Sequence, residues 1–415
     1  MRKIILSLVC ISLLSTAADA KRYIVTVENT SRAPINWDMF VSRAGGNVVE
    51  TFDSIDGALL ELSDEQAERI MSRRAPGMTI EEDLVINWIK ETPTSAKQAF
   101  GSYANNSGAK MPVPAPAPVA VQSREPAAAA TTVPMHGEVP WGVFRVNAAG
   151  LWNVTEGAGV KVAVIDSGVN YNHEDLKANY VDGANYSGLI SGIFGVKFGD
   201  PMDDNGHGTH VAGTIAAARN GKGVVGVAPK AKIYSVKVMN KDGSGSLSSI
   251  IKGVEWAVKN KMNIVNMSLG GGPYVEAMHK AVKNAVDNGV TIIAAAGNDS
   301  GPVNYPAKYP EVIAVSASAP NDTIAPFSSR GPEIDVMAPG MWIYSTSMDG
   351  GYVELHGTSM ACPHVAGLAA LAYSAGYRTP QSIRNILKKS AMKIKDLTAE
   401  EQGAGIPNAA KMKKK

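Results

Sequence analysis

An aspartate, a histidine and a serine that together could carry out acyl transfer lie in three glycine-rich segments of this sequence. Asp166 ends an apolar run and precedes Ser-Gly, His207 lies within Asn-Gly-His-Gly-Thr-His, and Ser359 follows Gly-Thr and precedes an apolar run. A serine at the start of a helix has unpaired backbone N–H groups beside its hydroxyl, and the helix dipole favours negative charge there. A hydrolase needs this combination of an exposed nucleophile and donors for an oxyanion.

Each of these residues also has an ordinary structural interpretation. Asp166 could cap a turn, and Ser359 could be a helix N-cap. His207 could be a core residue or form an H-x-x-H metal pair with His210. Their joint occurrence and order favour catalysis. The α/β-hydrolases need a histidine well after the serine, whereas the only later histidine, His364, lies five residues beyond it.

Length and composition describe an ordinary globular protein. The chain has 415 residues, of which 45% are hydrophobic and 19% charged, and its formal net charge is +2. This length is sufficient for two domains with a full core. A net charge this close to zero gives no reason to expect a nucleic-acid partner. The lysine-rich segment 411–415 is expected to be a solvated tail.

The N-terminus has the pattern of a secretory signal peptide, predicted as residues 1–20. Arg2 and Lys3 precede an apolar stretch too short to span a bilayer, and Ala18-Asp-Ala20 matches a cleavage site. We therefore expect a secreted protein, extracellular or periplasmic if the host has an outer membrane. No other segment is apolar enough for stable membrane insertion after signal removal.

The two cysteines have no predicted catalytic role. Cys10 lies in the apolar stretch of the signal, where we interpret it as filler, and the mature chain would keep only Cys362. Intramolecular disulfides are therefore excluded. A helix would turn Cys362 away from Ser359, so we predict a small buried hydrophobic residue.

Residues 21–92 are predicted to form a small α+β domain of the ferredoxin-like type. Their pattern alternates as β-α-β-β-α-β, and a capping box at Ser63-Asp-Glu-Gln66 begins the second helix. Residues 93–133 are rich in Pro and Ala, as in an extended linker. The large domain is predicted to span residues 134–415.

Within the large domain, apolar segments of strand length alternate with helical patterns. This alternation predicts an α/β fold with a mostly parallel sheet that helices cover on both faces. Asp166, Asn298 and the segment 268–271 follow apolar strands, whereas His207 and Ser359 precede helices. Because parallel strands end at one edge, we expect these positions at a single rim, where ligands bind in such folds.

Four motifs surround the candidate residues, namely Val164–Gly168, Asn205–Gly213, Ala296–Asn298 and Gly357–Gly367. Together, and in the order Asp, His, Ser, they resemble the subtilisin-like serine proteases of the subtilase family. The similarity covers nearly all of residues 138–410. Residues 22–90 resemble the family's inhibitory propeptide more weakly, chiefly through Glu81-Glu-Asp83.

The resemblance implies roles for four residues. Ser359 would attack the peptide carbonyl, and His207 would take its proton and return it to the leaving amine. Asp166 would hold the imidazole tautomer and stabilise the imidazolium. Asn298 and the backbone N–H of Ser359 would donate hydrogen bonds to the oxyanion.

The resemblance also implies a cleft in which two backbone strands pair with the substrate. The residues expected to bind it are Gly243, Gly245, Leu247, Ser268, Leu269, Gly270, Ala295 and Gly297. The small residues would leave an open slot for the side chain before the scissile bond, so we predict broad specificity with an apolar preference. Leu247 stands where many relatives carry an aromatic ring, and a second upstream pocket is expected to differ. Asp299 either admits a basic side chain or lies in a solvated turn.

A structural calcium ion is a further implication of the resemblance. The expected ligands are oxygen atoms of Asp175, Ala218, Asn220, Lys222 and Val224. The family's glutamine ligand aligns with Gly137, so either Glu138 replaces it or the site is weaker. The acidic segment 200–204 is a second candidate, or else a solvated loop.

These expectations describe a secreted serine endopeptidase made as a self-processing zymogen. Its partners would be protein or peptide substrates and its own propeptide, which would inhibit it until cleavage near residues 88–92, near 134–138, or at both. An inactive binding module and an esterase on another fold are the alternatives. No triad residue is missing, and no histidine suited to an esterase follows the serine, so both are disfavoured. A processing or a degradative role is left open.

Overall fold

The computed structural model describes residues 20–28, 35–89, 138–188 and 199–415. The predicted linker lies outside the described residues, as do residues 1–19 of the predicted signal peptide and most of both candidate cleavage segments. The chain divides into two compact units. The first contains the residues up to Thr51 together with Asp56–Asp83, and the second contains Phe52–Ile55 with Leu84–Lys415.

The first unit has a four-stranded sheet with the order β2-β3-β1-β4. Its central strand β1 (Lys21–Thr26) pairs antiparallel with β3 (Gly57–Leu62) and β4 (Thr79–Glu82), and β2 (Asn47–Phe52) lies at the edge. This strand order confirms the expected α+β sheet. A 3₁₀ turn, η1 (Asp53–Ile55), separates β2 from β3.

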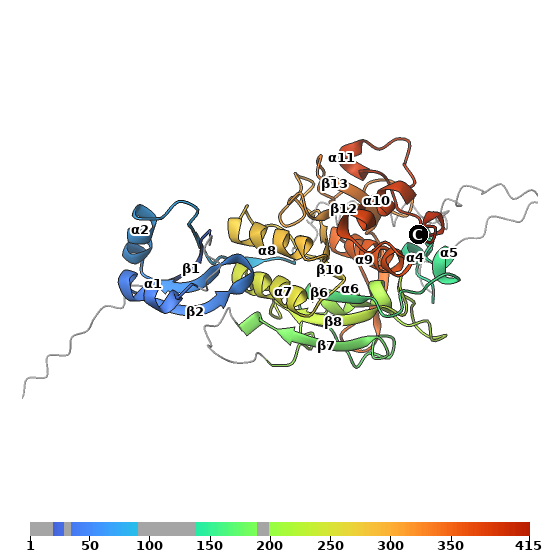
Figure 1. The fold of residues 1–415 in the computed structure, drawn as a ribbon. Helices are drawn as coiled ribbons and strands as arrows, with labels where there is room; N and C mark the ends of the chain where they lie inside the picture. The colour runs from blue at the N-terminus through green and yellow to red at the C-terminus, as the bar shows by residue number, and fades with distance from the viewer. Residues whose placement is uncertain (1–19, 29–34, 90–137, 189–198) are drawn as a thin grey trace, which may run out of the picture. The chain divides into compact units, whose positions relative to one another are not determined.

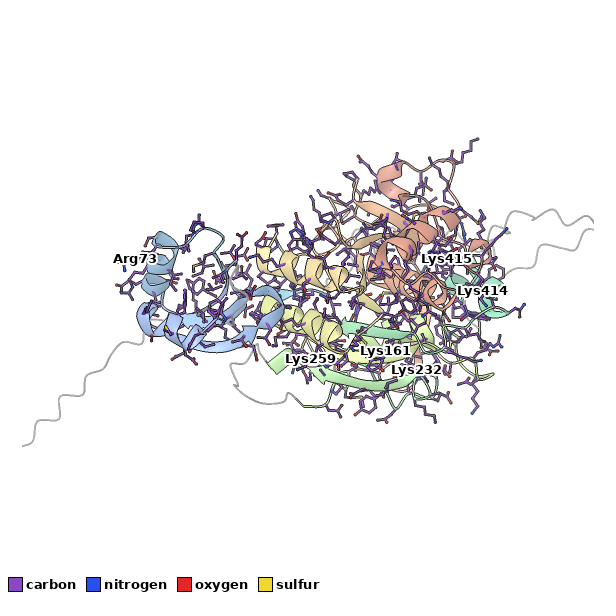
Figure 2. All side chains as sticks on the ribbon, in the orientation of Figure 1. Arg73, Lys161, Lys232, Lys259, Lys414 and Lys415 are labelled. Atoms are coloured by element: carbon purple, nitrogen blue, oxygen red, sulfur yellow. The ribbon has the colours of Figure 1, made fainter. Side chains whose placement is uncertain are left out.

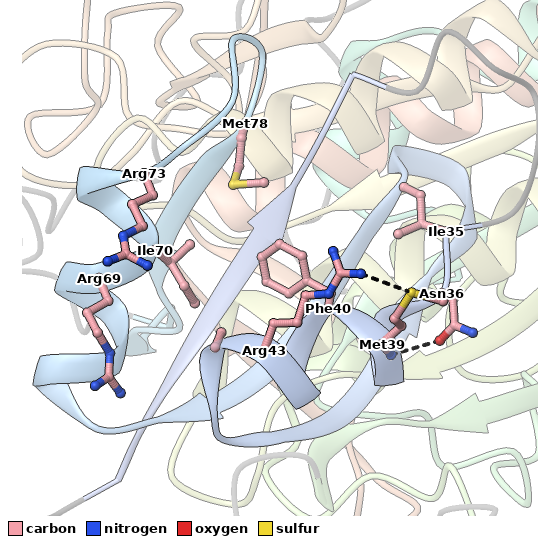
Figure 3. A pocket seen from close by; sticks show the side chains of 10 residues that line it. Ile35, Asn36, Met39, Phe40, Arg43, Arg69, Ile70, Arg73 and Met78 are labelled. Atoms are coloured by element: carbon pink, nitrogen blue, oxygen red, sulfur yellow. Dashed lines mark hydrogen bonds between the residues drawn. The ribbon is translucent and has the colours of Figure 1, made fainter.

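Two helices complete the first unit, α1 (Trp37–Ala44) and α2 (Asp64–Ser72). The predicted capping box is formed between Ser63 and Gln66, which satisfies N–H groups at the start of α2. Trp37 and Val41 pack with Leu60 in the core of this unit. A groove on the helices is lined by apolar side chains and by Arg43, Arg69 and Arg73 (Figure 3).

The second unit is built on a seven-stranded parallel sheet with the order β13-β12-β11-β10-β6-β8-β7 (Figure 1). Its strands are β6 (Lys161–Asp166), β7 (Tyr180–Asn185), β8 (Lys232–Lys237), β10 (Ile264–Met267), β11 (Thr291–Ala295), β12 (Ile313–Ser318) and β13 (Ile334–Pro339). Five of these strands coincide with the apolar segments of the sequence that predicted strands, at residues 160–165, 233–238, 263–268, 290–295 and 312–316. The two that sequence reasoning missed, β7 and β13, are the edge strands, and β7 is largely unburied, so its residues carry no apolar run.

Helices cover both faces of this sheet, as predicted. Val162 and Val164 of β6 belong to the core that includes α6 (His207–Ala216) and α9 (Thr358–Ser374). The next side chain along the strand, that of Ile165, instead faces Gly253 of α7 (Leu247–Lys259). Since successive side chains of a strand point to opposite faces, α7 lies on the face opposite α6 and α9.

Further helices and strands of the second unit lie outside the seven-stranded sheet. They are α4 (Trp141–Arg145), α5 (Ala149–Trp152), α8 (Glu276–Asp287), α10 (Pro380–Ser390), α11 (Ala399–Gln402), η3 (Ala409–Lys411), the hairpin β14 (Ile343–Thr346) and β15 (Tyr352–Leu355), and the antiparallel pair β5 (Val85–Asn87) and β9 (Ser244–Ser246). His207 and Ser359 lie within the first turns of α6 and α9, not before them as predicted. Across the described residues, no helix has the length and apolar character needed to cross a membrane.

The C-terminal lysine segment is only partly the solvated tail that was expected. Lys414 and Lys415 have exposed side chains (Figure 2), but Met412 is buried in the core of the second unit. The backbone N–H of Lys415 also donates to the carbonyl of Ala375 at 3.0 Å. The chain end is therefore docked on the domain by an apolar contact that lies within the charged run.

Candidate active site

Asp166 is the last residue of β6, and its carboxylate is completely buried. Its Oδ1 accepts hydrogen bonds from the backbone N–H of Ser167 at 2.7 Å and from Nδ1 of His207 at 2.8 Å. Oδ2 has no hydrogen-bond partner among the described residues. Because a buried carboxylate is costly without compensation, this arrangement strongly favours a positively charged or donating group at His207.

Two glycines allow α6 to begin against the end of β6. A Cβ atom on Gly208 would lie 2.0 Å from the carbonyl oxygen of Gly168 and 3.2 Å from the Cβ of Asp166. A Cβ on Gly168 would meet the backbone of Met202 and Asp203 at 2.7–2.8 Å. Both motifs, Asp-Ser-Gly and His-Gly, therefore need glycine for close backbone approach.

His207 is the first residue of α6 and is buried. Burial lowers the pKa of its imidazole, but the charge and hydrogen bond of Asp166 and the charge of Asp203 outweigh this effect, so the pKa lies above 6.5. His210 lies one turn later, where its Nε2 contacts the carbonyl oxygen of Ile343 at 2.9 Å, and burial lowers its pKa to about 3. The two histidines thus engage different partners, which does not support the H-x-x-H metal interpretation.

Ser359 is the second residue of α9, whose N-cap is Gly357. The Oγ donates to the carbonyl oxygen of Ser268 at 3.1 Å, and the hydroxyl of Ser268 donates to the carbonyl oxygen of Ser359 at 2.8 Å. These reciprocal bonds tie the start of α9 to the end of β10. Since Ser359 is in the first turn, its backbone N–H has no acceptor in the preceding turn of the helix.

Asn298 is held so that its amide nitrogen is available as a donor. Its Oδ1 accepts from both the backbone N–H and the hydroxyl of Thr358, each at 2.8 Å. A Cβ on Gly357 would lie 3.3 Å from Nδ2 of Asn298 and 3.5 Å from the backbone nitrogen of Ser359. The two nitrogens therefore flank one small space that glycine leaves open, which is the arrangement an oxyanion requires.

One of the two segments predicted to bind substrate backbone, that of Gly243 and Gly245, pairs with an extended segment of the chain itself. β5 pairs antiparallel with β9, with Ile86 opposite Gly245, and the backbone N–H of Trp88 donates to the carbonyl oxygen of Gly243 at 3.0 Å. The indole N–H of Trp88 donates to the carbonyl oxygen of Gly245 at 2.8 Å. Trp88 also lines a small recess, together with Leu247, Ile250, Leu269, Pro273, Val275, Met278, Tyr305, Pro306 and Tyr309.

The predicted slot between Gly270, Ala295 and Gly297 contains a residue that sequence reasoning missed. A Cβ on Gly297 would lie 2.3 Å from Nδ2 of Asn304, and one on Gly270 would lie 3.6 Å from the Asn304 Cβ. The Asn304 side chain therefore lines the slot. Only its position shortly after the Ala-Gly-Asn motif offered a signal.

Asp299 is exposed beside this slot and is hydrogen-bonded. It accepts from the Ser329 hydroxyl at 2.7 Å, and its contact with the Asn304 amide is long at 3.5 Å. Partial burial opposes ionisation, but these and backbone hydrogen bonds lower the pKa of Asp299 below its usual value. A negative charge therefore stands next to the slot at neutral pH.

The residues predicted to hold calcium come together around one loop. Asp175 is completely buried, and it accepts from Nδ2 of Asn220 at 2.9 Å and from the backbone N–H of Val224 at 3.0 Å. Its carbonyl oxygen accepts from the N–H of Ala218 at 2.8 Å, and Lys222 donates its N–H to the Asn220 side chain. Two further groups reach this region, Glu138, which was expected as a possible ligand, and Tyr352, which was not expected. Glu138 accepts from the N–H of Gly221 at 3.2 Å, and the Tyr352 hydroxyl donates to Asp175 at 2.9 Å.

Cys362 is fully buried, and burial raises the pKa of its thiol above the usual range. Its Sγ faces the carbonyl oxygens of Met267 and Ile293 at 3.9 and 3.4 Å. The residue is therefore a packed core side chain.

Comparison with known proteins gives a consistent result. Residues 157–407 match the model of the subtilase family, peptidase S8. The chain is 45% identical to subtilisin DY from Bacillus licheniformis over 274 residues, which is 62% of this chain and 93% of that protein. It is 44% identical to subtilisin Savinase from Lederbergia lenta over 279 residues, 65% of this chain and 97% of that protein. Subtilisin E from Bacillus subtilis strain 168 is 48% identical over 242 residues, 57% of this chain and 61% of that protein.

We expect the imidazole of His207 to titrate above 6.5, because Asp166 and Asp203 favour its protonated form. The ring resonances of His207, assigned with a His207→Gln variant, would be followed by NMR against pH. Asp166→Ala should lower the midpoint, since burial of the ring remains while the charge and the hydrogen bond of Asp166 are lost. A midpoint below 6.5 in the unmodified chain would contradict this electrostatic account.

Replacement of Asn298 by alanine should lower kcat and leave KM nearly unchanged, because the amide donor is needed only once negative charge develops on the oxyanion. The loss should be on the order of 100- to 1000-fold, a size established on a subtilisin and not calculated from this geometry. Steady-state kinetics on a chromogenic peptide would measure it, with the melting midpoint as a check of the fold. A rise in KM with kcat unchanged would assign Asn298 to substrate binding instead.

Proposed function

The chain belongs to the subtilase family of serine peptidases, and from this premise we propose that Ser359, His207 and Asp166 form the triad of an exported, self-processing endopeptidase. The observation that carries the proposal is the 2.8 Å contact between Nδ1 of His207 and the buried carboxylate of Asp166. With Nδ1 donating to Asp166, Nε2 of the neutral ring is the acceptor that a general base requires.

In the proposed reaction, Ser359 transfers its proton to Nε2 of His207 and attacks the carbonyl carbon of the scissile bond. Its Oγ, which donates to the carbonyl oxygen of Ser268, must first turn towards the imidazole. The imidazolium is stabilised by Asp166, whose second oxygen contributes negative charge without a competing donor among the described residues. His207 then gives the proton to the leaving amine, and water hydrolyses the acyl-enzyme by the same steps.

The proposed oxyanion site consists of Nδ2 of Asn298 and the backbone N–H of Ser359. Support for it comes from the two hydrogen bonds of Thr358 to Oδ1 of Asn298, which fix the amide with its nitrogen turned away from Thr358. Donors fixed before reaction need no reorganisation when charge develops on the carbonyl oxygen.

We also propose that residues 21–92 are an inhibitory propeptide whose last strand occupies the substrate cleft. The support is the pairing of β5 with β9, in which peptide backbone forms the hydrogen bonds that a substrate would form. The buried side chain of Trp88 adds apolar surface to this contact, because it lines the same recess as Leu247 and Leu269. This placement favours a cut soon after Trp88 over a cut at 134–138, because the chain already enters the cleft there.

The proposed specificity is broad. The apolar preference is proposed for the recess lined by Leu247 and Leu269, because its lining is mainly aliphatic and aromatic. The slot before the scissile bond is more polar than the small residues alone suggest, since Asn304 lines it and Asp299 lies beside it. We therefore propose that this slot also accepts basic side chains, and that protein chains in extended conformation are the substrates.

A structural calcium ion is proposed at the loop of Asp175 and Asn220. The donor set fits a hard cation, because it includes the carboxylates of Asp175 and Glu138, an amide, and backbone carbonyls. In the described part of the chain, the groups that donate to the buried carboxylate of Asp175 are all neutral, so a cation would be favourable there. Tyr352 donates to the same carboxylate and would remain beside the ion. Calcium here would brace the loop and supply no step of catalysis.

Export is proposed from the pattern of residues 1–20, which resembles a signal peptide with an Ala-x-Ala cleavage site. The mature enzyme would then act outside the cytoplasm.

Purified full-length protein should shorten on incubation, whereas its Ser359→Ala form should keep its full mass or stay bound to the uncut propeptide. Intact-mass spectrometry of both would reveal the difference, and the new N-terminus would locate the cut. Wild-type enzyme added to the variant in trans controls for the accessibility of the linker. Equal full masses, together with no cleavage of a denatured protein by the wild type, would refute the proposal.

Excess chelator should lower the melting midpoint of the mature enzyme, because an ion that binds only the folded state stabilises it by mass action, by about 2.7 kcal/mol at 100 times Kd. Calcium should restore the midpoint. In an Asp175→Ala variant, chelator should have little further effect, which separates this loop from any other site. A midpoint that chelator leaves unchanged in the wild type would rule out the calcium assignment.

A further inference from the structure

Asp203 is a buried carboxylate in the acidic segment 200–204, next to the proposed triad and outside it. It is only 7% exposed and accepts five hydrogen bonds. Oδ1 accepts from the Ser167 hydroxyl at 2.9 Å and from the backbone N–H groups of Asn205 and Gly206 at 3.0 and 2.9 Å. Oδ2 accepts from the N–H and the hydroxyl of Thr209 at 2.9 and 2.6 Å. Asp203 is thus neither solvated nor free to ligate a cation, unlike either expectation for this segment.

These bonds replace a cap that α6 lacks. The N-cap residue Gly206 has a left-handed conformation, with φ of 101°, and has no side chain to accept from the first turn. Asp203 accepts the N–H of Gly206 and, one turn along, that of Thr209. A carboxylate at a helix N-terminus also interacts favourably with the helix dipole. Asp203 therefore determines where α6 begins, and His207 is the first residue of that helix.

The same carboxylate connects α6 to the end of β6. The Ser167 hydroxyl, which donates to Asp203, accepts the backbone N–H of Gly208 at 3.0 Å. The backbone N–H of Ser167 donates to Oδ1 of Asp166. This network links Asp203 to Ser167, which follows Asp166, and through Ser167 to Gly208, which follows His207. A shift of Asp203 would therefore move Asp166 and His207 relative to each other.

The charges near His207 come from several elements. Asp166 of β6 and Asp203 are negative, and His210 on α6 is neutral because burial lowers its pKa to about 3. Lys237, at the end of β8, is 3% exposed and donates to the carbonyl oxygen of Ser167 and to Asp204. Its positive charge is thereby paired with Asp204, which leaves Asp203 with no cationic partner among the described residues.

We propose that Asp203 is a positioning residue for the triad histidine, which holds the start of α6 against the end of β6 and favours the imidazolium that forms when Ser359 is deprotonated. The proposal rests on the assignment of Asp166, His207 and Ser359 as the triad. In this role Asp203 touches neither the substrate nor the reacting atoms. It acts on His207 through both geometry and charge.

The test is the pH profile of kcat/KM for the mature Asp203→Asn enzyme on a chromogenic peptide, with active sites titrated so that only folded enzyme is counted. We expect kcat to fall by at least roughly tenfold with KM nearly unchanged, since small misplacements of catalytic groups are costly. The acid limb should move to lower pH, because removal of a negative charge lowers the pKa of His207. Asp200→Asn is the matched control. It removes one charge from the same segment, at an exposed carboxylate that accepts from Tyr171 and Met202, and should leave kcat and the limb unchanged.

An acid limb of Asp203→Asn at the wild-type pH would overturn the proposal, because a purely structural role would not move it. If this variant does not fold, Asp203→Glu keeps the charge and lengthens the side chain. It should lower kcat and leave the limb in place, and wild-type kcat in that variant would equally overturn the proposal. Failure of the triad itself is distinguishable, since Ser359→Ala would then retain activity.

Discussion

The hydrogen bond between Asp166 and His207 is the interaction on which the rest of the site depends. A fully buried carboxylate is tolerated only where donors surround it. Those donors are the N–H of Ser167 and the imidazole of His207, so α6 must begin within van der Waals contact of the end of β6. That proximity in turn requires glycine at positions 168 and 208, where any Cβ would collide with backbone. Glycine is thus required in the Asp-Ser-Gly and His-Gly motifs because the buried carboxylate of Asp166 needs α6 to pack closely against β6.

The parallel sheet supplies the remaining positions. β6 lies between β8 and β10, and β11 follows β10 in the sheet. Asp166 ends β6, and Ser268 and Asn298 follow β10 and β11. The three residues therefore lie at the carboxyl ends of neighbouring strands, although 132 residues separate the first from the last by their numbers. The hydrogen bonds between Ser268 and Ser359 then hold the start of α9 at the carboxyl ends of these strands. Ligand binding at the carboxyl ends of parallel strands is a general property of such sheets. Here the same end of the sheet also holds the first turn of α9.

Buried central strands were predictable because a short, continuous apolar run is typical of a strand that is covered on both faces. The edge strand β7 was not, since Tyr180–Asn185 is largely unburied and has no such run. The docking of Met412 was also not predicted. Four lysines around one methionine are typical of a solvated chain end, yet the methionine is buried. Asp203 was hidden in an acidic segment, where composition indicates a surface loop. Its hydrogen bonds come from residues 205–209 and from Ser167, 36 positions away in the chain, and composition alone does not indicate that these donors surround it.

The sequence by itself determined the class of sheet, the four motifs and the chemical types available at the rim, because apolar periodicity and glycine placement are local properties of the chain. Only the tertiary structure decided which oxygen of Asp166 meets His207, that Asn304 lines the slot, and that Asp203 caps a helix whose own N-cap is glycine. Each of these depends on which side chains converge from separate parts of the chain. Convergence of that kind is set by packing in three dimensions, where burial makes every unpaired polar atom costly.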